Sequence, residues 1–121
     1  MTFTTPAFRA GGMLIAGTDP TGVGGVVPGY SNERQLELLV ESGFTPLEAI
    51  RIGTLNGATF LGRANRAGSI AVGKDADLVV ISGDPATRIS DVRNVQTVFR
   101  QGVGYDPITL RESVRGKVGL F

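Results

Sequence analysis

Histidine, cysteine and tryptophan are all missing from this chain of 121 residues. Without histidine the chain cannot hold a Ser-His-Asp or Cys-His relay, because each needs an imidazole as its general base. Without histidine and cysteine it also lacks the usual ligands of zinc. Carboxylates, lysines, tyrosines and hydroxyls are left for chemistry. We therefore expect no complete hydrolytic metal centre, and no bound cofactor, in the isolated chain.

The sequence also lacks a large excess of charge of either sign and long apolar runs. The 12 basic and 11 acidic residues give a net charge of +1 and are interspersed, so the basic stripe of a nucleic-acid-binding protein is missing. The longest apolar stretches are 13–16 and 78–81, far short of the roughly 20 residues of a membrane span. The opening segment MTFTTPAFRAGG does not resemble a signal peptide. These observations predict a cytoplasmic protein with no nucleic-acid or membrane partner.

Glycine is abundant, with 18 residues, and many of them surround a short apolar run. Residues Met13 to Ala16 have the length of a buried strand, and a glycine-rich loop follows over 17–25. The glycine spacing of this loop resembles that of a P-loop. However, Val23 and Gly24 stand where the phosphate-binding lysine and its neighbouring hydroxyl are required. We therefore interpret the loop as a strand-to-helix connection and not as a nucleotide site.

The pattern predicts a first helix that begins near Asn32 and ends at Gly43. Asn32 and Gln35 have the spacing of a capping box, and glycine is common just after a helix. The apolar residues of this stretch, Leu36, Leu39 and Val40, follow the i, i+3, i+4 spacing of an amphipathic helix.

Two further helices are predicted between this point and Gly62. The stretch Thr45-Pro46-Leu47-Glu48 begins the second, with an N-cap threonine, a proline at the first position and a glutamate at the third. We expect Gly53 to interrupt it and Thr54 to cap a third helix over 55–61.

The period then changes to that of strands. Residues 76–82 predict a buried strand that ends at Gly83-Asp84-Pro85, and residues 94–100 alternate as a second strand. Gln101-Gly102 predicts a tight turn into a third strand at 103–105. A helical turn is expected over 110–114. The predicted fold class is α+β.

Asp19 is the main candidate for chemistry. It follows the predicted strand 13–16 at its carboxyl end, the edge where α/β sheets and barrels bind ligands. A carboxylate there can bind a divalent metal or act as a general base. An aspartate before proline is also a common turn residue, so a structural role stays open. The other aspartates near the strand 76–82 are interpreted as turn residues: Asp75, Asp77 and Asp84.

Four segments together resemble one known family. In order they read AGTDPTG at 16–22, LELLVESGFTPLEAIRIGTLNGATFLG at 36–62, GSIAVGKDADLVVISGDP at 68–85 and NVQTVFRQGVGYD at 94–106. They resemble the carboxyl-terminal third of the amidohydrolase superfamily, most of all the branch of imidazolonepropionase-like and Xaa-Pro dipeptidase-like enzymes. The resemblance extends from residue 13 to about residue 107.

The resemblance implies an architecture and a role for Asp19. Residues 1–62 would be the last βα unit and helices of the (β/α)₈ barrel of a metal-dependent hydrolase. Residues 63–121 would be the carboxyl-terminal part of a small β-sandwich. The stretch 13–17 would be the eighth barrel strand. Asp19 would then be the carboxylate that binds the metal and takes the proton from its water. The intact family would use zinc or another divalent metal.

The family's histidine ligands are missing here, and two interpretations follow. The chain is either a fragment of an amidohydrolase for non-peptide or dipeptide C–N bonds, inactive alone, or a non-catalytic, self-associating remnant. The first requires a chain that supplies the missing barrel. In both, apolar strands lack their neighbours, so we expect a homo-oligomer, most simply a dimer, that buries Met13 to Ala16 or the β-rich end. The substrate is not specified, because the other barrel loops are absent from the sequence.

Overall fold

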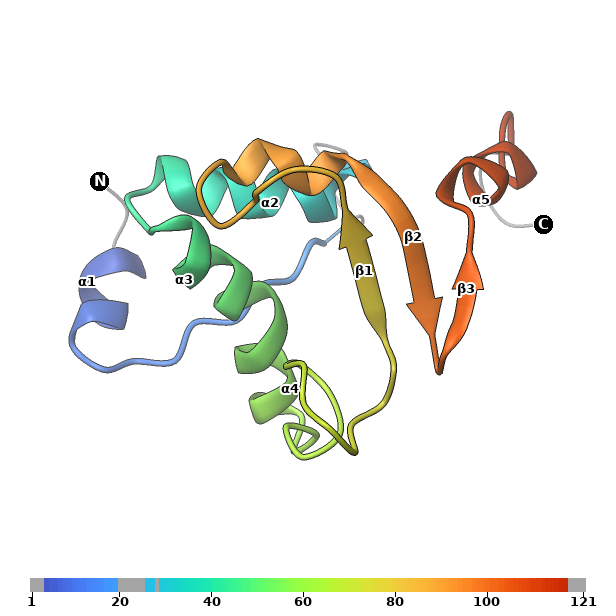
Figure 1. Ribbon diagram of the computed structural model, residues 1–121. Helices are drawn as coiled ribbons and strands as arrows, with labels where there is room; N and C mark the ends of the chain where they lie inside the picture. The colour runs from blue at the N-terminus through green and yellow to red at the C-terminus, as the bar shows by residue number, and fades with distance from the viewer. Residues whose placement is uncertain (1–3, 20–25, 28, 118–121) are drawn as a thin grey trace.

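The computed structural model describes residues 4–19, 26–27 and 29–117. Figure 1 shows a helical part at one end and an antiparallel sheet at the other, with α5 beyond the sheet. The elements in chain order are α1 (Thr4–Arg9), α2 (Tyr30–Glu41), α3 (Pro46–Arg51), a π-helical turn η1 (Ile52–Asn56), α4 (Gly57–Phe60), β1 (Leu78–Ile81), a 3₁₀ helix η2 (Ile89–Arg93), β2 (Val95–Arg100), β3 (Val103–Tyr105) and α5 (Pro107–Ser113). The predicted α+β class is confirmed. No helix in these described ranges is long and apolar enough to cross a membrane.

Helix α2 begins earlier than predicted. Its N-cap is Gly29, whose φ of 84° suits glycine, and Asn32 therefore lies inside the first turn. The prediction that Asn32 caps the helix is wrong, because the helix has already begun at Tyr30. The Asn32 side chain instead accepts a hydrogen bond from the Thr18 hydroxyl. The predicted end is confirmed: Gly43 follows the helix with a φ of 99°.

The second predicted helix start is confirmed in detail. The Glu48 amide donates to Thr45 Oγ1 at 3.3 Å, and the Thr45 amide donates to Glu48 Oε2 at 2.8 Å, which completes a capping box. The predicted interruption at Gly53 is wrong, because α3, η1 and α4 follow one another without a break. Thr54 does not act as a cap and donates its hydroxyl to the Ile50 carbonyl at 2.7 Å. A Cβ on Gly53 would lie 2.7 Å from Leu36 Cδ2, so this glycine allows α2 to approach closely.

The sheet has the order β1-β2-β3, and both strand pairs are antiparallel. The strands are confirmed but shorter than the predicted ranges 76–82 and 94–100. The prediction that the first strand is buried is wrong, because Val79 and Val80 of β1 are about half exposed. The predicted turn at Gln101-Gly102 is also confirmed, and both residues have positive φ, as tight hairpin turns require. Helix α5 begins before the predicted turn at 110–114, because Asp106 accepts a hydrogen bond from the Thr109 amide and caps it.

The expected strand over 13–16 is not part of a sheet. Residues 12–19 are assigned to no helix or strand, and the described sheet consists of β1 to β3. The alternation of exposed Met13 and Ile15 with half-buried Leu14 and Ala16 has the period of an extended chain. A strand is defined by its pairing, and the described parts of the chain offer this segment no neighbouring strand.

The apolar core lies in the helical part. The apolar side chains buried below a tenth of their surface are Phe44, Ala49, Ile52 and Val92, and none of them comes from the three strands. Phe8 of α1 packs edge-on against Phe44, with ring centroids 5.2 Å apart. The three strands therefore contribute no fully buried apolar side chain to the described core.

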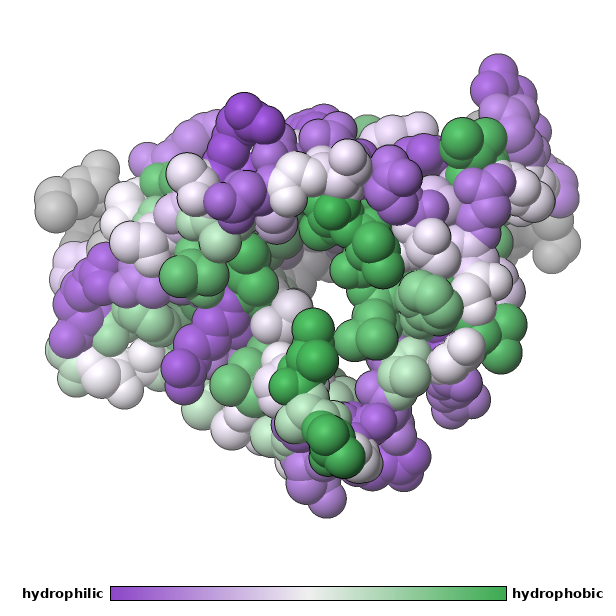
Figure 2. Space-filling view, viewed as in Figure 1, coloured by the Kyte–Doolittle hydropathy of each residue, from purple (hydrophilic) through white to green (hydrophobic). Residues whose placement is uncertain are grey.

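The molecule exposes far more surface than a compact protein of its size. Its accessible surface is 8652 Å², about 2,400 Å² above the roughly 6,200 Å² that scaling gives for a 12.7 kDa monomer. Figure 2 shows apolar side chains around an opening between the helical part and the sheet. Large apolar residues stay more than two-thirds exposed at the end of α4 and between α4 and β1, namely Phe60, Leu61, Ile70 and Val72. This surface has the character of an interface.

Helix α2 and η2 join the helical part to the sheet. Arg93 donates from Nε and Nη2 to the two oxygens of Glu37, at 2.6 and 2.8 Å. Arg34 also reaches Glu37, at 3.1 Å. The hydrogen bonds from Arg93 lower the pKa of Glu37 to about 2, although partial burial of the carboxyl acts in the opposite direction.

A second polar anchor lies in the turn after β1. Asp91 is 4% exposed and accepts the Asp84 amide at 2.9 Å as well as two bonds from Arg88, which lower its pKa. A Cβ on Gly83 would lie 2.4 Å from Asp91 Oδ2, and the φ of Gly83 is 128°. Glycine at 83 is therefore required both by the backbone and by the carboxylate packed against it.

Replacement of Glu37 by glutamine tests the joint between α2 and η2. Because the folded-state pKa of Glu37 is lowered, its stabilising effect is present above the ordinary carboxyl value of about 4.3 and is lost as the pH falls toward 2. We expect Glu37→Gln to lower the free energy of unfolding at pH 7 by about 1 to 2 kcal/mol, with a smaller loss at pH 3. Urea denaturation at both pH values measures this.

Glu33→Gln is the control for this substitution, because it removes the same charge from the same helix and keeps the Glu37–Arg93 pair. Equal effects of the two substitutions would contradict the assignment.

Replacement of Gly83 by alanine tests the turn around Asp91. The added methyl group would collide with the Asp91 carboxylate and hold an unfavourable φ, so we expect a loss of about 2 to 4 kcal/mol. Gly73→Ala is the matched control, since Gly73 has a φ of 87° but open space around its Cα. It should cost about 1 kcal/mol. Losses of the same size in urea denaturation would show that the contact with Asp91 is unimportant.

Candidate functional site

Asp19 ends the described segment 12–19, which runs beside the helical part (Figure 1). The residue is exposed, in contrast to the buried aspartate Asp91. The loop predicted to follow it includes Pro20 to Gly25, and these six residues lie outside the described part of the chain. The structure therefore describes the backbone that precedes Asp19.

Polar side chains hold this segment against two helical elements. Asn56 of η1 is itself buried, at 8% exposure, and α2 contributes two further side chains. The three bonds run from Asn56 Nδ2 to the Leu14 carbonyl at 2.8 Å, from Gln35 Nε2 to the Gly17 carbonyl at 3.1 Å, and from Thr18 Oγ1 to Asn32 Oδ1 at 3.0 Å. These side-chain hydrogen bonds hold the segment, whereas backbone hydrogen bonds to a neighbouring strand would hold it in a sheet. Sequence reasoning singled out Asn32 and Gln35 for a cap and missed this role.

The described residues do not by themselves form a metal centre. Within the described residues, no three side chains of the His, Cys, Asp or Glu type gather closely enough to hold an ion. The whole sequence contributes no imidazole or thiolate. Asp19 alone supplies one carboxylate, whereas catalytic zinc sites take about three protein ligands. What Asp19 can do from its position is to accept a proton or contribute one ligand.

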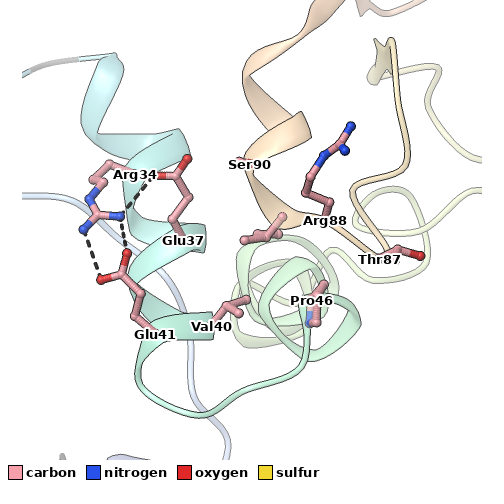
Figure 3. A pocket seen from close by; sticks show the side chains of 9 residues that line it. Arg34, Glu37, Val40, Glu41, Pro46, Thr87, Arg88 and Ser90 are labelled. Carbon is pink, nitrogen blue, oxygen red and sulfur yellow. Dashed lines mark hydrogen bonds and ion pairs between the residues drawn. The ribbon is translucent and has the colours of Figure 1, made fainter.

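A groove of about 480 Å³ lies elsewhere, between α2 and the residues before and within η2 (Figure 3). Its lining includes Arg34, Glu37 and Glu41 of α2, and Arg88 across the groove. Arg34 bonds both glutamates, and its hydrogen bond to Glu41 raises the pKa of Arg34 and lowers that of Glu41. Arg34 is thus paired with the two glutamates, and Arg88 is paired with Asp91. We interpret it as the outer side of the joint between α2 and η2.

The remaining candidate carboxylates occupy turns, as predicted. Asp77 accepts the amide of Gln101 at 2.7 Å, and Asp84 accepts the hydroxyl of Thr87 at 2.7 Å. Asp75 accepts a bond from the Arg66 side chain at 3.0 Å. These hydrogen bonds give each of the three aspartates a structural role.

Known proteins resemble this chain along most of its length. A sequence model of the amidohydrolase family matches residues 6–104. An imidazolonepropionase of Thermoplasma volcanium is 38% identical over 64 residues, which are 50% of this chain and 16% of that protein.

Solved structures extend the likeness to the fold. A protein of Bifidobacterium longum assigned as a prolidase superposes with a TM-score of 0.73 at 37% identity, over 83% of this chain and 24% of that one. A Xaa-Pro dipeptidase with methionine bound in its active site superposes with a TM-score of 0.73 at 33% identity, over 84% of this chain and 24% of the other. The chain therefore spans about a quarter or less of these relatives, and, since the family match covers most of its residues, it belongs to the amidohydrolase family.

Proposed function

We propose that this chain is the carboxyl-terminal part of a metal-dependent amidohydrolase that hydrolyses C–N bonds. The observation that carries the proposal is the size of the match. More than four-fifths of this chain superposes on the two solved structures, yet it accounts for 24% of each. In this proposal, segment 13–17 is the eighth strand of the barrel, within a remnant that extends to residue 62. Residues 63–121 then form the sandwich-like part, and the remaining strands and metal ligands lie on polypeptide outside this sequence.

Asp19 is the residue through which the chain would contribute to chemistry. Hydrolysis of a C–N bond needs an attacking water and a group that takes its proton, and a carboxylate serves as such a base. A bound divalent metal would supply the charge that activates water in the complete enzyme. Asp19 is exposed at the end of a segment that Asn56 and Gln35 hold in place. An exposed, positioned carboxylate is what a shared active site requires from this chain.

The substrate class follows from the relatives alone. The relatives described above include an imidazolonepropionase and a Xaa-Pro dipeptidase. We propose a non-peptide or dipeptide C–N bond as the target, with Xaa-Pro dipeptides as the first substrates to test.

The exposed apolar surface supports a missing partner. Val79 and Val80 of β1 point to opposite faces of the sheet, and about half of each side chain is exposed. A sheet that is uncovered on both faces fits the middle of a larger assembly.

A hybrid enzyme tests the proposal. The full chain replaces the superposable carboxyl-terminal quarter of the Xaa-Pro dipeptidase. We expect this hybrid to hydrolyse Xaa-Pro dipeptides, whereas the chain alone retains no stoichiometric zinc after dialysis against a chelator and shows no activity. Asp19→Asn in the hybrid should lower kcat by about 10² to 10⁴, because the general base is lost.

Asp75→Asn serves as the control, since Asp75 is a turn carboxylate bonded to Arg66. The proposal is contradicted if the folded, metal-loaded hybrid is inactive, if Asp19→Asn leaves kcat unchanged, or if the chain alone turns over substrate.

A second candidate function is a self-associating, non-catalytic remnant. The exposed side chains favour it, because a second copy could cover them in place of the rest of the enzyme. In either case the chain alone should not be a monomer, and light scattering at micromolar concentration should give a mass of about twice 12.7 kDa.

Two substitutions locate the contact between copies. Val79→Lys should restore the monomer if the sheet forms the interface, and Met13→Lys should do so if the segment does. A monodisperse 12.7 kDa monomer with a cooperative melt would contradict self-association. A dimer together with an inactive hybrid would favour the remnant over the enzyme part.

A further inference from the structure

We propose that Gln35, Asn32 and Asn56 are positioning residues for Asp19. They hold the backbone that leads into this carboxylate, in place of the neighbouring strands that the described residues do not provide. The inference rests on the proposed function of Asp19, and it adds the residues on which the placement of that carboxylate depends. None of the three would touch the substrate.

The two residues of α2 act at the points closest to Asp19. Gln35 and Asn32 are three positions apart on one helix, so their side chains are neighbours on the same face. Gln35 Nε2 donates to the carbonyl of Gly17, and Asn32 Oδ1 accepts the hydroxyl of Thr18. Both residues that directly precede Asp19 are therefore fixed to α2. Because successive Cα atoms are about 3.8 Å apart, these two bonds restrict the position of the Asp19 backbone.

Asn56 fixes the other end of the segment. Its amide is 8% exposed and donates to the Leu14 carbonyl at 2.8 Å. A buried amide that lost this acceptor would keep the cost of its desolvation, so the bond is costly to break. Asn56 lies in the π-helical turn η1, one turn after the fully buried Ile52. Such turns are rare and are enriched at functional sites.

The two supports are themselves locked together. Leu36, the neighbour of Gln35, lies so close to Gly53 of η1 that a Cβ there would be 2.7 Å from its Cδ2. Helix α2 and η1 therefore have a fixed separation, and the segment 14–18 is bonded to both. A displacement of Asp19 would require at least one of these bonds to break. Misplacement of a catalytic group by about 1 Å can cost 10²-fold in rate.

The hydrogen-bond directions give a test that a general effect on folding would not reproduce. Gln35→Glu removes the donor and places a carboxylate against the Gly17 carbonyl. Asn32→Asp, in contrast, keeps an acceptor for the Thr18 hydroxyl. The same amide-to-acid change should therefore be more harmful at 35 than at 32. Gln96→Glu, at an exposed position of β2, is the matched control.

The first measurement uses the hybrid with the Xaa-Pro dipeptidase. We expect Gln35→Glu to lower kcat by about 10- to 100-fold with KM changed less than about threefold, Asn32→Asp to lower kcat by less than Gln35→Glu does, and Gln96→Glu to stay within about twofold of the parent. An unchanged kcat for Gln35→Glu in an active hybrid overturns the positioning role. So does an equal fall in all three variants.

The second measurement uses the full chain alone and does not depend on activity. Hydrogen–deuterium exchange should become faster over residues 13–19 in Gln35→Glu and stay unchanged in Gln96→Glu. Unchanged exchange in Gln35→Glu overturns the inference. If the parent hybrid is inactive while exchange responds as expected, the proposed function of Asp19 fails but the support of the segment stands.

Discussion

The two-point bond between Arg93 and Glu37 joins parts of this molecule that otherwise share little surface. Helix α2 belongs to the helical part with its small core, and η2 leads directly into the sheet. Asp91 lies in the same 3₁₀ helix and fixes the turn after β1 through the Asp84 amide. The position of the sheet relative to the helices therefore depends on these charged contacts together with the buried side chain of Val92 in η2. Figure 2 shows an opening between the helical part and the sheet.

The proposed function accounts for the combination of an amidohydrolase sequence with a small apolar core. Among the described residues, four apolar side chains are buried, and Val79, Val80 and Val103 of the strands remain about half exposed. The same residues would be buried if the rest of a relative were present, since this chain covers 24% of the solved structures that it matches. The absent histidines have the same explanation in the proposed function. The ligands would belong to the part of the enzyme that this sequence does not contain, and Asp19 would be its contribution to the shared site.

Local signals in the sequence predicted the elements that depend on neighbours in the chain. The capping box at Thr45, the glycine after α2 and the turn at Gln101-Gly102 were all predicted, because each is determined by a few adjacent residues. The break expected at Gly53 did not occur, because this glycine serves the approach of Leu36 from α2. The predicted strand at 13–16 has no partner within the described residues, and pairing is a property of the whole fold. The supports of Asp19 were missed for the same reason, since Asn56 and Leu14 are 42 positions apart.

Formation of a complex with the missing part is the most direct test of the central claim. The Xaa-Pro dipeptidase without the quarter that superposes on this chain is co-expressed with this chain, and the purified material is measured by light scattering. The account predicts a one-to-one complex that contains both polypeptides and replaces any self-associated form of the chain. Two separate species, with the chain still bound only to itself, would contradict the claim that its apolar surface is made for the rest of an amidohydrolase.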